Sequence, residues 1–175
     1  MDVECKDREL VNLFPFICMI QKKNLPLQSE SAFCTTMTRL ELKVDMDEVR
    51  RARAFALSIA DHAGFSERQT QNLRLVVEEV VANIVNYSGA TMMELRAWQE
   101  DGSLYVSFAD DGIPFDPTQH PEPDLTLPIE ERAIGGLGIH YIRKMSDGVA
   151  YRREDGKNIL TVWKALGNHS NIKIH

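Results

Sequence analysis

The sequence predicts an α+β fold, a two-layer sandwich in which a mixed, mostly antiparallel sheet carries helices on one face. From Thr38 onward, segments with strand and helix periodicity follow one another in the order β-α-α-β-β-α-β-β. Only short turn sequences, Glu100-Asp101-Gly102 and Asp155-Gly156, separate two pairs of strands, as in antiparallel hairpins. The 175 residues, 43% of them hydrophobic, are enough for one domain with its own core.

The first three elements have clear local signals. Alternation of polar and apolar residues predicts a half-buried strand over Thr38–Val44. Asp45 or Asp47 can cap a helix that runs to about His62 and is closed by Gly64. A second helix begins after Ser66, where a glutamine three residues later completes a capping box, and it runs to about residue 87.

The remaining elements surround one long loop. The second helix is followed by strands over Thr91–Gln99 and Ser103–Ala109, then by the loop, a short helix after Gly138 that ends near Asp147, and strands over Val149–Glu154 and Asn158–Leu166. The loop, residues 110–132, is rich in proline and acidic side chains. Loops longer than about 15 residues within a compact domain are usually functional or disordered. We therefore expect the functional site to lie around this loop.

Three parts are expected along the chain: an N-terminal extension or linker over residues 1–37, the patterned domain over 38–166 and a C-terminal tail over 167–175. All three cysteines lie in the first part, an odd number at one end that favours reduced thiols in a cytoplasmic protein over a disulfide framework. A net charge of −6 argues against direct nucleic-acid binding. No apolar run approaches the roughly 20 residues of a membrane span.

A first constellation lies on the second helix. Helical spacing places Glu79, Asn83 and Asn86 on one flank of the apolar stripe and Glu78 on the other. The stripe consists of Leu73, Val76, Val77, Val80, Val81 and Ile84. An asparagine oxygen can ligate Mg²⁺, and a nearby glutamate can act as a general base. The alternative is an ordinary helix with polar residues beside its buried stripe. Taken by itself, this segment favours that alternative.

Two further constellations lie at the ends of the loop. A strand ending in Asp110-x-Gly112 presents a carboxylate that could accept the exocyclic amine of adenine, although an ordinary Asp-Gly turn explains it equally well. At the other end, Gly135-Gly136-Leu137-Gly138 opens a helix, where backbone amides could bind phosphate with Arg132 nearby. A flexible joint and a solvated arginine are the alternatives there.

The order of these motifs resembles that of a known superfamily. Glu79-x-x-x-Asn83, Asp110-x-Gly112-x-Pro114-Phe115 and Gly136-Leu137-Gly138 follow the N, G1 and G2 boxes of GHKL ATP-binding proteins. This superfamily includes gyrase, heat-shock chaperone ATPases, mismatch-repair ATPases and histidine kinases. Over residues 38–166 the chain is most similar to the stand-alone anti-sigma-factor serine kinases of bacteria.

The resemblance implies a Bergerat fold that binds ATP and Mg²⁺ beneath a mobile lid. It implies that Glu79 is the catalytic base, that Asn83 is the magnesium ligand and that Asp110 binds adenine. The other nucleotide-binding positions are Asn86, Gly112, Pro114, Phe115, Arg132, Gly135, Gly136, Leu137 and Gly138. Glu78 is then a solvated neighbour, and Tyr87 stands where many of these kinases carry histidine.

The implied function is a cytoplasmic serine/threonine kinase acting as an anti-sigma factor. Members of this group bind a sigma factor and phosphorylate a small antagonist protein, and the resemblance also suggests a homodimer. The alternative is a nucleotide-regulated binding module that sequesters a regulatory partner without phosphotransfer. A structural domain that binds no nucleotide is a third hypothesis.

Overall fold

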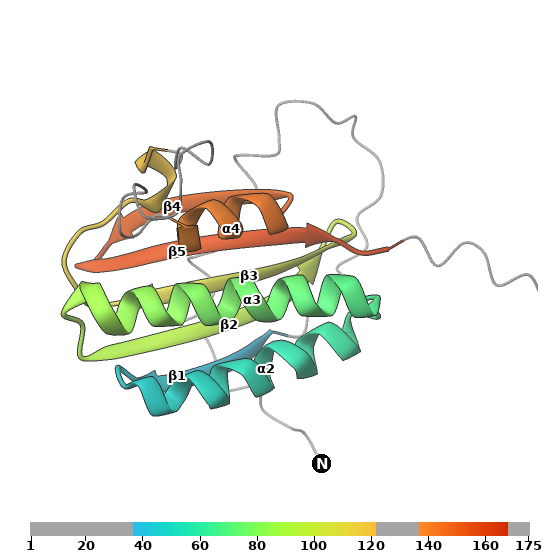
Figure 1. Cartoon of the computed structure of the whole chain (residues 1–175), viewed down its shortest axis with the longest axis horizontal. Helices are drawn as coiled ribbons and strands as arrows, with labels where there is room; N and C mark the ends of the chain where they lie inside the picture. Colours follow the sequence, from blue (N-terminus) through green and yellow to red (C-terminus); the bar gives the residue numbers. More distant parts are fainter. Residues whose placement is uncertain (1–36, 122–136, 168–175) are drawn as a thin grey trace, which may run out of the picture. The chain divides into compact units, whose positions relative to one another are not determined.

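Five strands and three α-helices form the part of the chain that the structure describes, residues 37–121 and 137–167 of a computed structural model (Figure 1). The strands lie in the order β1-β2-β3-β5-β4, and all four pairings between neighbours are antiparallel. They are β1 (Thr38–Lys43), β2 (Met92–Glu100), β3 (Ser103–Asp110), β4 (Gly148–Glu154) and β5 (Lys157–Ala165). The predicted α+β class is confirmed, with a described sheet that is antiparallel throughout rather than mixed.

Both predicted hairpins are present. Asp101 and Gly102 join β2 to β3 with φ angles of 46° and 71°, and Asp155 and Gly156 join β4 to β5 with φ angles of 48° and 77°. Positive φ at both central residues produces the tight turn whose twist matches that of the flanking strands. Aspartate and glycine tolerate this conformation better than most residues, so the turn sequence determines how each pair of strands meets.

The first helices begin where their caps were expected. The Asp45 carboxylate accepts a hydrogen bond from the backbone N–H of Asp47 and caps the 3-10 turn η1 (Met46–Glu48), which leads into α2 (Val49–His62). Of the two predicted caps, Asp45 caps this 3-10 turn, whereas the N-cap of α2 itself is Glu48, which makes no side-chain capping hydrogen bond. Ser66 caps α3 (Glu67–Asn83), and its capping box with Gln69 is complete.

The third helix and the end of the second differ from the prediction. Helix α4 (Leu137–Met145) already includes Gly138, which we expected to precede it. After Asn83 the α3 helix continues as a π-helical turn, η2 (Ile84–Ser88), and Gly89 then adopts a left-handed conformation with φ of 64°. The predicted helix to about residue 87 thus contains a change of helical period at its last turn.

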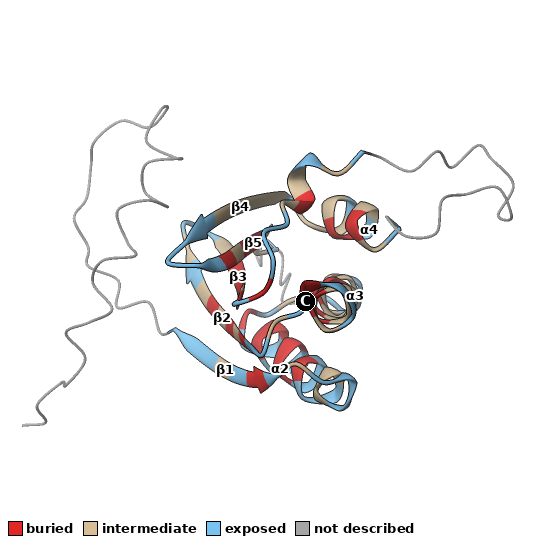
Figure 2. Ribbon diagram, turned by 90° about the vertical axis from the view of Figure 1, so that its left-hand side faces the viewer, coloured by how far each residue is buried: buried red, intermediate tan, exposed pale blue. Residues whose placement is uncertain are grey.

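All three α-helices cover one face of the sheet, as Figure 2 shows in a view along the layers. Helix α3 lies between α2 and α4 and packs against both. Its predicted apolar stripe is buried and joins the inward-facing side chains of the sheet, such as Leu95, Val106 and Phe108, in one core. Because this core holds α3 in place, the polar residues beside the stripe have fixed positions.

The opposite face of the sheet carries an aromatic stack. Trp98, Tyr105 and Trp163 are neighbours on β2, β3 and β5, with ring centroids 5.3 Å apart for the first pair and 5.9 Å for the second. Gly148 lies beside Trp163 on β4, and a Cβ at Gly148 would come within 1.9 Å of the indole ring. The stack thus requires glycine at this position of the edge strand.

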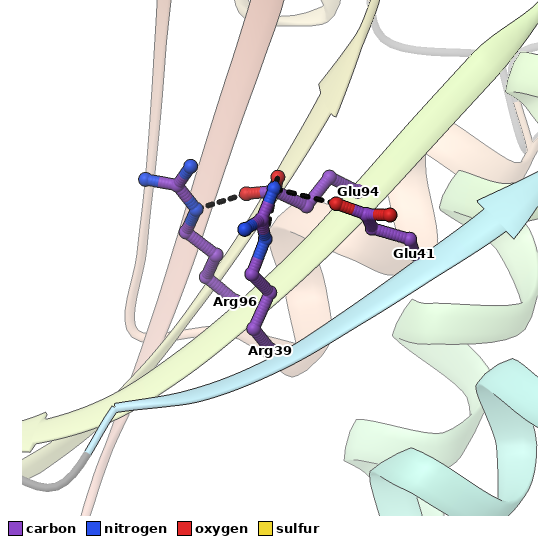
Figure 3. Close-up of polar contacts among 4 residues, drawn as sticks. All are labelled: Arg39, Glu41, Glu94 and Arg96. Atoms are coloured by element: carbon purple, nitrogen blue, oxygen red, sulfur yellow. Dashed lines mark hydrogen bonds and ion pairs between the residues drawn. The ribbon is translucent and has the colours of Figure 1, made fainter. Parts of the chain in front are cut away.

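A charged cluster on the same face connects the edge strand β1 to β2 (Figure 3). Arg39 on β1 forms ion pairs with Glu41 and with Glu94 on β2, and Arg96 also binds Glu94. Burial alone would raise the pKa of Glu94, but the hydrogen bonds from Arg96 and Arg39 outweigh it and the net effect lowers that pKa. Charged side chains of this kind discourage another strand from pairing with the exposed edge.

Candidate active site

Adjacent glutamates near the end of α3 have different surroundings. Glu78 accepts hydrogen bonds from Arg53 on α2 at 2.6 Å and from Arg74 at 2.9 Å, and its side chain is only 19% exposed. The expectation that Glu78 is a solvated neighbour is therefore wrong. Its carboxylate connects two helices, an arrangement that depends on how α2 packs against α3.

Glu79 is half-buried on the other side of α3, and it makes no hydrogen bond or ion pair with any residue that the structure describes. Glu79 is of intermediate burial, so part of this residue is exposed to solvent. A half-buried carboxylate to which the described residues offer no hydrogen bond can accept a proton from a bound molecule.

Gly138, in the first turn of α4, lies directly against this carboxylate. A Cβ at Gly138 would be 2.5 Å from Oε2 of Glu79 and 3.5 Å from Nδ2 of Asn83. The structure thus brings together residues that are separated by more than 50 positions in the sequence. Asn83 is also half-buried and has no hydrogen-bond partner among the described residues, so its amide is free to bind a ligand.

Asp110 is the last residue of β3, and it is buried at 6% exposure. Its Oδ1 accepts hydrogen bonds from the backbone N–H of Gly112 at 2.9 Å and from Nδ2 of Asn158 at 3.0 Å. No hydrogen bond from the described residues reaches Oδ2. One carboxylate oxygen is thus held by the protein, and the other can accept a hydrogen bond from a ligand.

Asn158 is a site residue that the sequence reasoning missed. It lies opposite Asp110 in the β3–β5 register, and its amide also donates to the carbonyl of Ile113 at 2.8 Å. Its own carbonyl accepts from Tyr151 at 2.8 Å and from Arg153 at 2.7 Å. A buried asparagine that binds so many partners fixes the turn after β3. The available signal was an asparagine near the start of a strand whose centre is mostly apolar.

The π-helical turn η2 brings the end of α3 to the same turn. The carbonyl of Ser88 accepts a hydrogen bond from the N–H of Ile113 at 2.8 Å, and a Cβ at Gly112 would lie 2.5 Å from that carbonyl. Asn86 and Tyr87 are exposed in this turn, where the α-helical spacing used to place Asn86 beside Asn83 no longer applies. Because glycine has no Cβ, Gly112 lets the backbone after β3 approach the carbonyl of Ser88 more closely than any other residue would allow.

The remaining predicted positions lie at the edges of this arrangement. Phe115 is 49% exposed, and its N–H donates to Oδ1 of Asn158 at 3.4 Å, while Pro114 is exposed beside it. Leu137 is 39% exposed at the start of α4. Arg132, Gly135 and Gly136 fall outside the described residues, as does much of the predicted lid.

The donor set fits a magnesium ion that is held mainly by phosphate groups. Within residues 37–121 and 137–167, no three His, Cys, Asp or Glu side chains gather closely enough to hold a metal by themselves. Mg²⁺ usually keeps water and phosphate oxygens as ligands and takes only one or two from the protein. The amide oxygen of Asn83, which accepts no hydrogen bond from the described part of the chain, can supply such a ligand.

Comparison with known proteins agrees with this geometry. A family model described as the histidine kinase-like ATPase domain matches residues 42–164. The chain belongs to the histidine kinase-like ATPase family. The match includes all three α-helices, strands β2, β3 and β4, most of β5 and the end of β1, and it therefore contains Glu79, Asn83, Asp110 and Gly138.

Two relatives of this chain are named as protein kinases. The serine/threonine-protein kinase BtrW of Bordetella bronchiseptica is 31% identical over 129 residues, which cover 70% of this chain and 89% of BtrW. The serine-protein kinase RsbW of Listeria monocytogenes is 26% identical, with 69% and 82% covered. A Mycobacterium tuberculosis crystal structure of RsbU and RsbW domains superposes with a TM-score of 0.55 at 16% identity, covering 75% of this chain and 33% of that one, which supports the fold.

By these relationships the chain is an ATP-dependent serine/threonine protein kinase that resembles the anti-sigma type. In the described ranges, no helix combines the length and the apolar character needed to cross a bilayer.

Proposed function

We propose that this kinase phosphorylates a serine or threonine on a small antagonist protein and that it binds a sigma factor as the other partner of the same switch. The single observation that carries the proposal is the contrast between two adjacent carboxylates. Glu78 is engaged by two arginines, whereas Glu79 has no partner among the described residues and lies against Asn83 and Gly138. An unengaged carboxylate beside a candidate magnesium ligand suits phosphoryl transfer better than a purely structural role.

Each residue has a defined role in the proposed reaction. Glu79 orients the acceptor hydroxyl and takes its proton while the hydroxyl oxygen bonds to the γ-phosphorus of ATP. The bond from the γ-phosphorus to the bridging oxygen breaks, and ADP leaves. The Oδ2 atom of Asp110 accepts a hydrogen bond from the exocyclic amine of adenine. Asn83 would hold Mg²⁺, which neutralises charge on the phosphates when it is bound.

The biological setting is part of the same proposal. The enzyme acts in the cytoplasm as a homodimer, and it contacts proteins rather than nucleic acid or membrane. Phosphorylation adds about −1.5 to −2 charges to the antagonist, enough to weaken an interface and release the kinase for its other partner. The net charge of −6 on this chain is consistent with repulsion of a phosphorylated antagonist.

The test compares Glu79→Gln with Glu78→Gln in transfer of radiolabelled γ-phosphate to a small antagonist-type protein that binds this chain. We expect Glu79→Gln to bind Mg·ATP but to transfer phosphate at least 100-fold more slowly, within the roughly 10²–10⁴-fold range of general-base catalysis. Glu78→Gln should be less stable but should retain transfer. Equal turnover in Glu79→Gln and the parent would refute the assignment of the base.

A second outcome would identify a different function. The alternative is a nucleotide-regulated binding module that sequesters a partner without phosphotransfer. Tyr87 is 71% exposed and stands where many related kinases carry histidine, so a histidine that could position water or the base is absent there. If the parent binds Mg·ATP and a confirmed antagonist tightly but transfers no phosphate, the binding-module function replaces the kinase proposal. If Mg·ATP does not raise the melting temperature, nucleotide binding itself is excluded.

A further inference from the structure

Arg143 connects two parts of the site that are distant in the sequence. It is half-buried in the last turn of α4, and its Nη2 atom donates to the carbonyl of Pro117 at 2.7 Å and to the carbonyl of His120 at 2.8 Å. Both carbonyls belong to the 3-10 turn η3 (Pro117–Gln119) and the residue after it. A charged donor bound to two carbonyls makes stronger hydrogen bonds than a neutral donor.

The η3 turn is itself ordered by its own cap. The carboxylate of Asp116 accepts from the N–H of Thr118 at 2.8 Å and from its hydroxyl at 2.6 Å. This turn directly follows the segment that contains Asp110 and Phe115. Arg143 therefore binds an ordered continuation of the segment that provides the adenine-binding carboxylate.

The other end of α4 lies at Glu79 and Asn83. Gly138 contacts Glu79, and it is five residues, or about 7.5 Å along a helix, from Arg143. Ile139 and Ile142 anchor the helix between these two positions in buried packing. A helix held in this way transmits the position of one end to the other.

We infer that Arg143 is a positioning residue that sets the spacing between the Asp110 segment and the Glu79–Gly138 contact. This role rests on the proposed function, because only a nucleotide spans both parts. A simpler explanation is that any cation near the end of α4 is favourable for the helix dipole. Lys144 provides the control, because it is adjacent in the same turn, exposed, and without a partner among the described residues.

The experiment measures affinity for Mg·ATP and for adenosine in Arg143→Met, Arg143→Lys and Lys144→Met, with melting temperatures of each protein. Adenosine contacts the adenine side alone, whereas ATP must reach both sides. We expect Arg143→Met to weaken Mg·ATP binding by roughly tenfold and adenosine binding by less than about twofold, since small misplacements at an active site have large effects. Arg143→Lys should recover part of the ATP affinity, and Lys144→Met should match the parent.

Two results would overturn this role. Equal losses of ATP and adenosine affinity in Arg143→Met, or an equal ATP loss in Lys144→Met, would reduce Arg143 to a stabilising residue or a helix-end charge. Arg143→Lys keeps the test valid if Arg143→Met fails to fold. Failure of the parent to bind Mg·ATP would instead refute the proposed function, and the role of Arg143 with it.

Discussion

A Cβ at Gly138 would lie 2.5 Å from Oε2 of Glu79, although the two residues belong to different helices. The atom in the way is the end of a flexible side chain, so an added methyl group displaces the carboxylate rather than the backbone. Because Gly138 has no side chain, helix α4 leaves room for the carboxylate of Glu79, the proposed base, at this position.

Gly138→Ala should separate stability from activity. Alanine is a better helix former than glycine, so we expect an unchanged or slightly raised melting temperature. Displacement of Glu79 should lower phosphotransfer by roughly tenfold or more. Gly167→Ala is the matched control, because its added Cβ would meet Oε1 of Gln69 at an ordinary 3.7 Å. A fully active Gly138→Ala enzyme would show that the contact does not fix the base.

Asp110→Asn should chiefly weaken nucleotide binding. The substitution replaces a charged acceptor with an amide, and a hydrogen bond to a charged group contributes about 1.5–3 kcal/mol, or roughly 10- to 150-fold in affinity. Asp111→Asn is the control one residue away, because the carboxylate of Asp111 binds Thr91 and Met92 rather than the residues around Asp110. Calorimetric titration with Mg·ATP measures the affinity of both variants. Equal affinity in Asp110→Asn and the parent would contradict the proposal that Asp110 binds adenine.

Asn158→Ala should lower both stability and ATP affinity. Its removal takes away one of the two donors to Oδ1 of Asp110, which keeps the N–H of Gly112, and it also removes the donor to the carbonyl of Ile113. The loss of these hydrogen bonds costs about 1–3 kcal/mol in the free energy of unfolding. Urea denaturation measures the change, with Asn72→Ala as the control at a half-buried α3 residue that has no hydrogen bond to the described residues. Identical midpoints for the two variants would mean that the Asn158 network adds no stability.

Acid should remove the contribution that Asp111 makes to the stability of the fold. Hydrogen bonds from the Thr91 hydroxyl and from the N–H groups of Met92 and Thr91 lower the pKa of this carboxyl from 3.8 to about 2. A pKa that is lower in the folded state than in the unfolded state stabilises the fold above the unfolded value and loses that effect as pH falls through the folded value. The difference in melting temperature between the parent and Asp111→Asn should therefore be constant above about pH 5 and shrink between about pH 4 and 2. A difference that is independent of pH down to 2 would contradict this.

The features that the sequence predicts best depend on residues close together in the chain. The Ser66–Gln69 capping box, the buried stripe of α3 and the Asp-Gly turns each follow from local spacing. These features place Glu79 and Asn83 on one side of α3, and the motif order identifies the family. Local spacing does not reveal the π-helical turn, because its period depends on contacts such as that between Ser88 and Ile113.

Features that depend on packing between elements were not predictable in this way. The ion pair of Glu78 requires Arg53, which is 25 residues away on α2. The roles of Asn158 and Arg143 depend on strand register and on the position of the η3 turn. Each of these side chains is an ordinary polar residue until its distant partner is known.

The aromatic stack has a practical consequence for spectroscopy. Both tryptophans of the chain belong to it, next to Tyr105, which is five positions and about 17 Å along β3 from Asp110. Intrinsic fluorescence should therefore report the melting of the sheet while staying nearly silent during nucleotide titration. The protein carries a built-in optical probe of its scaffold, and binding at the site has to be followed by a labelled nucleotide or by heat.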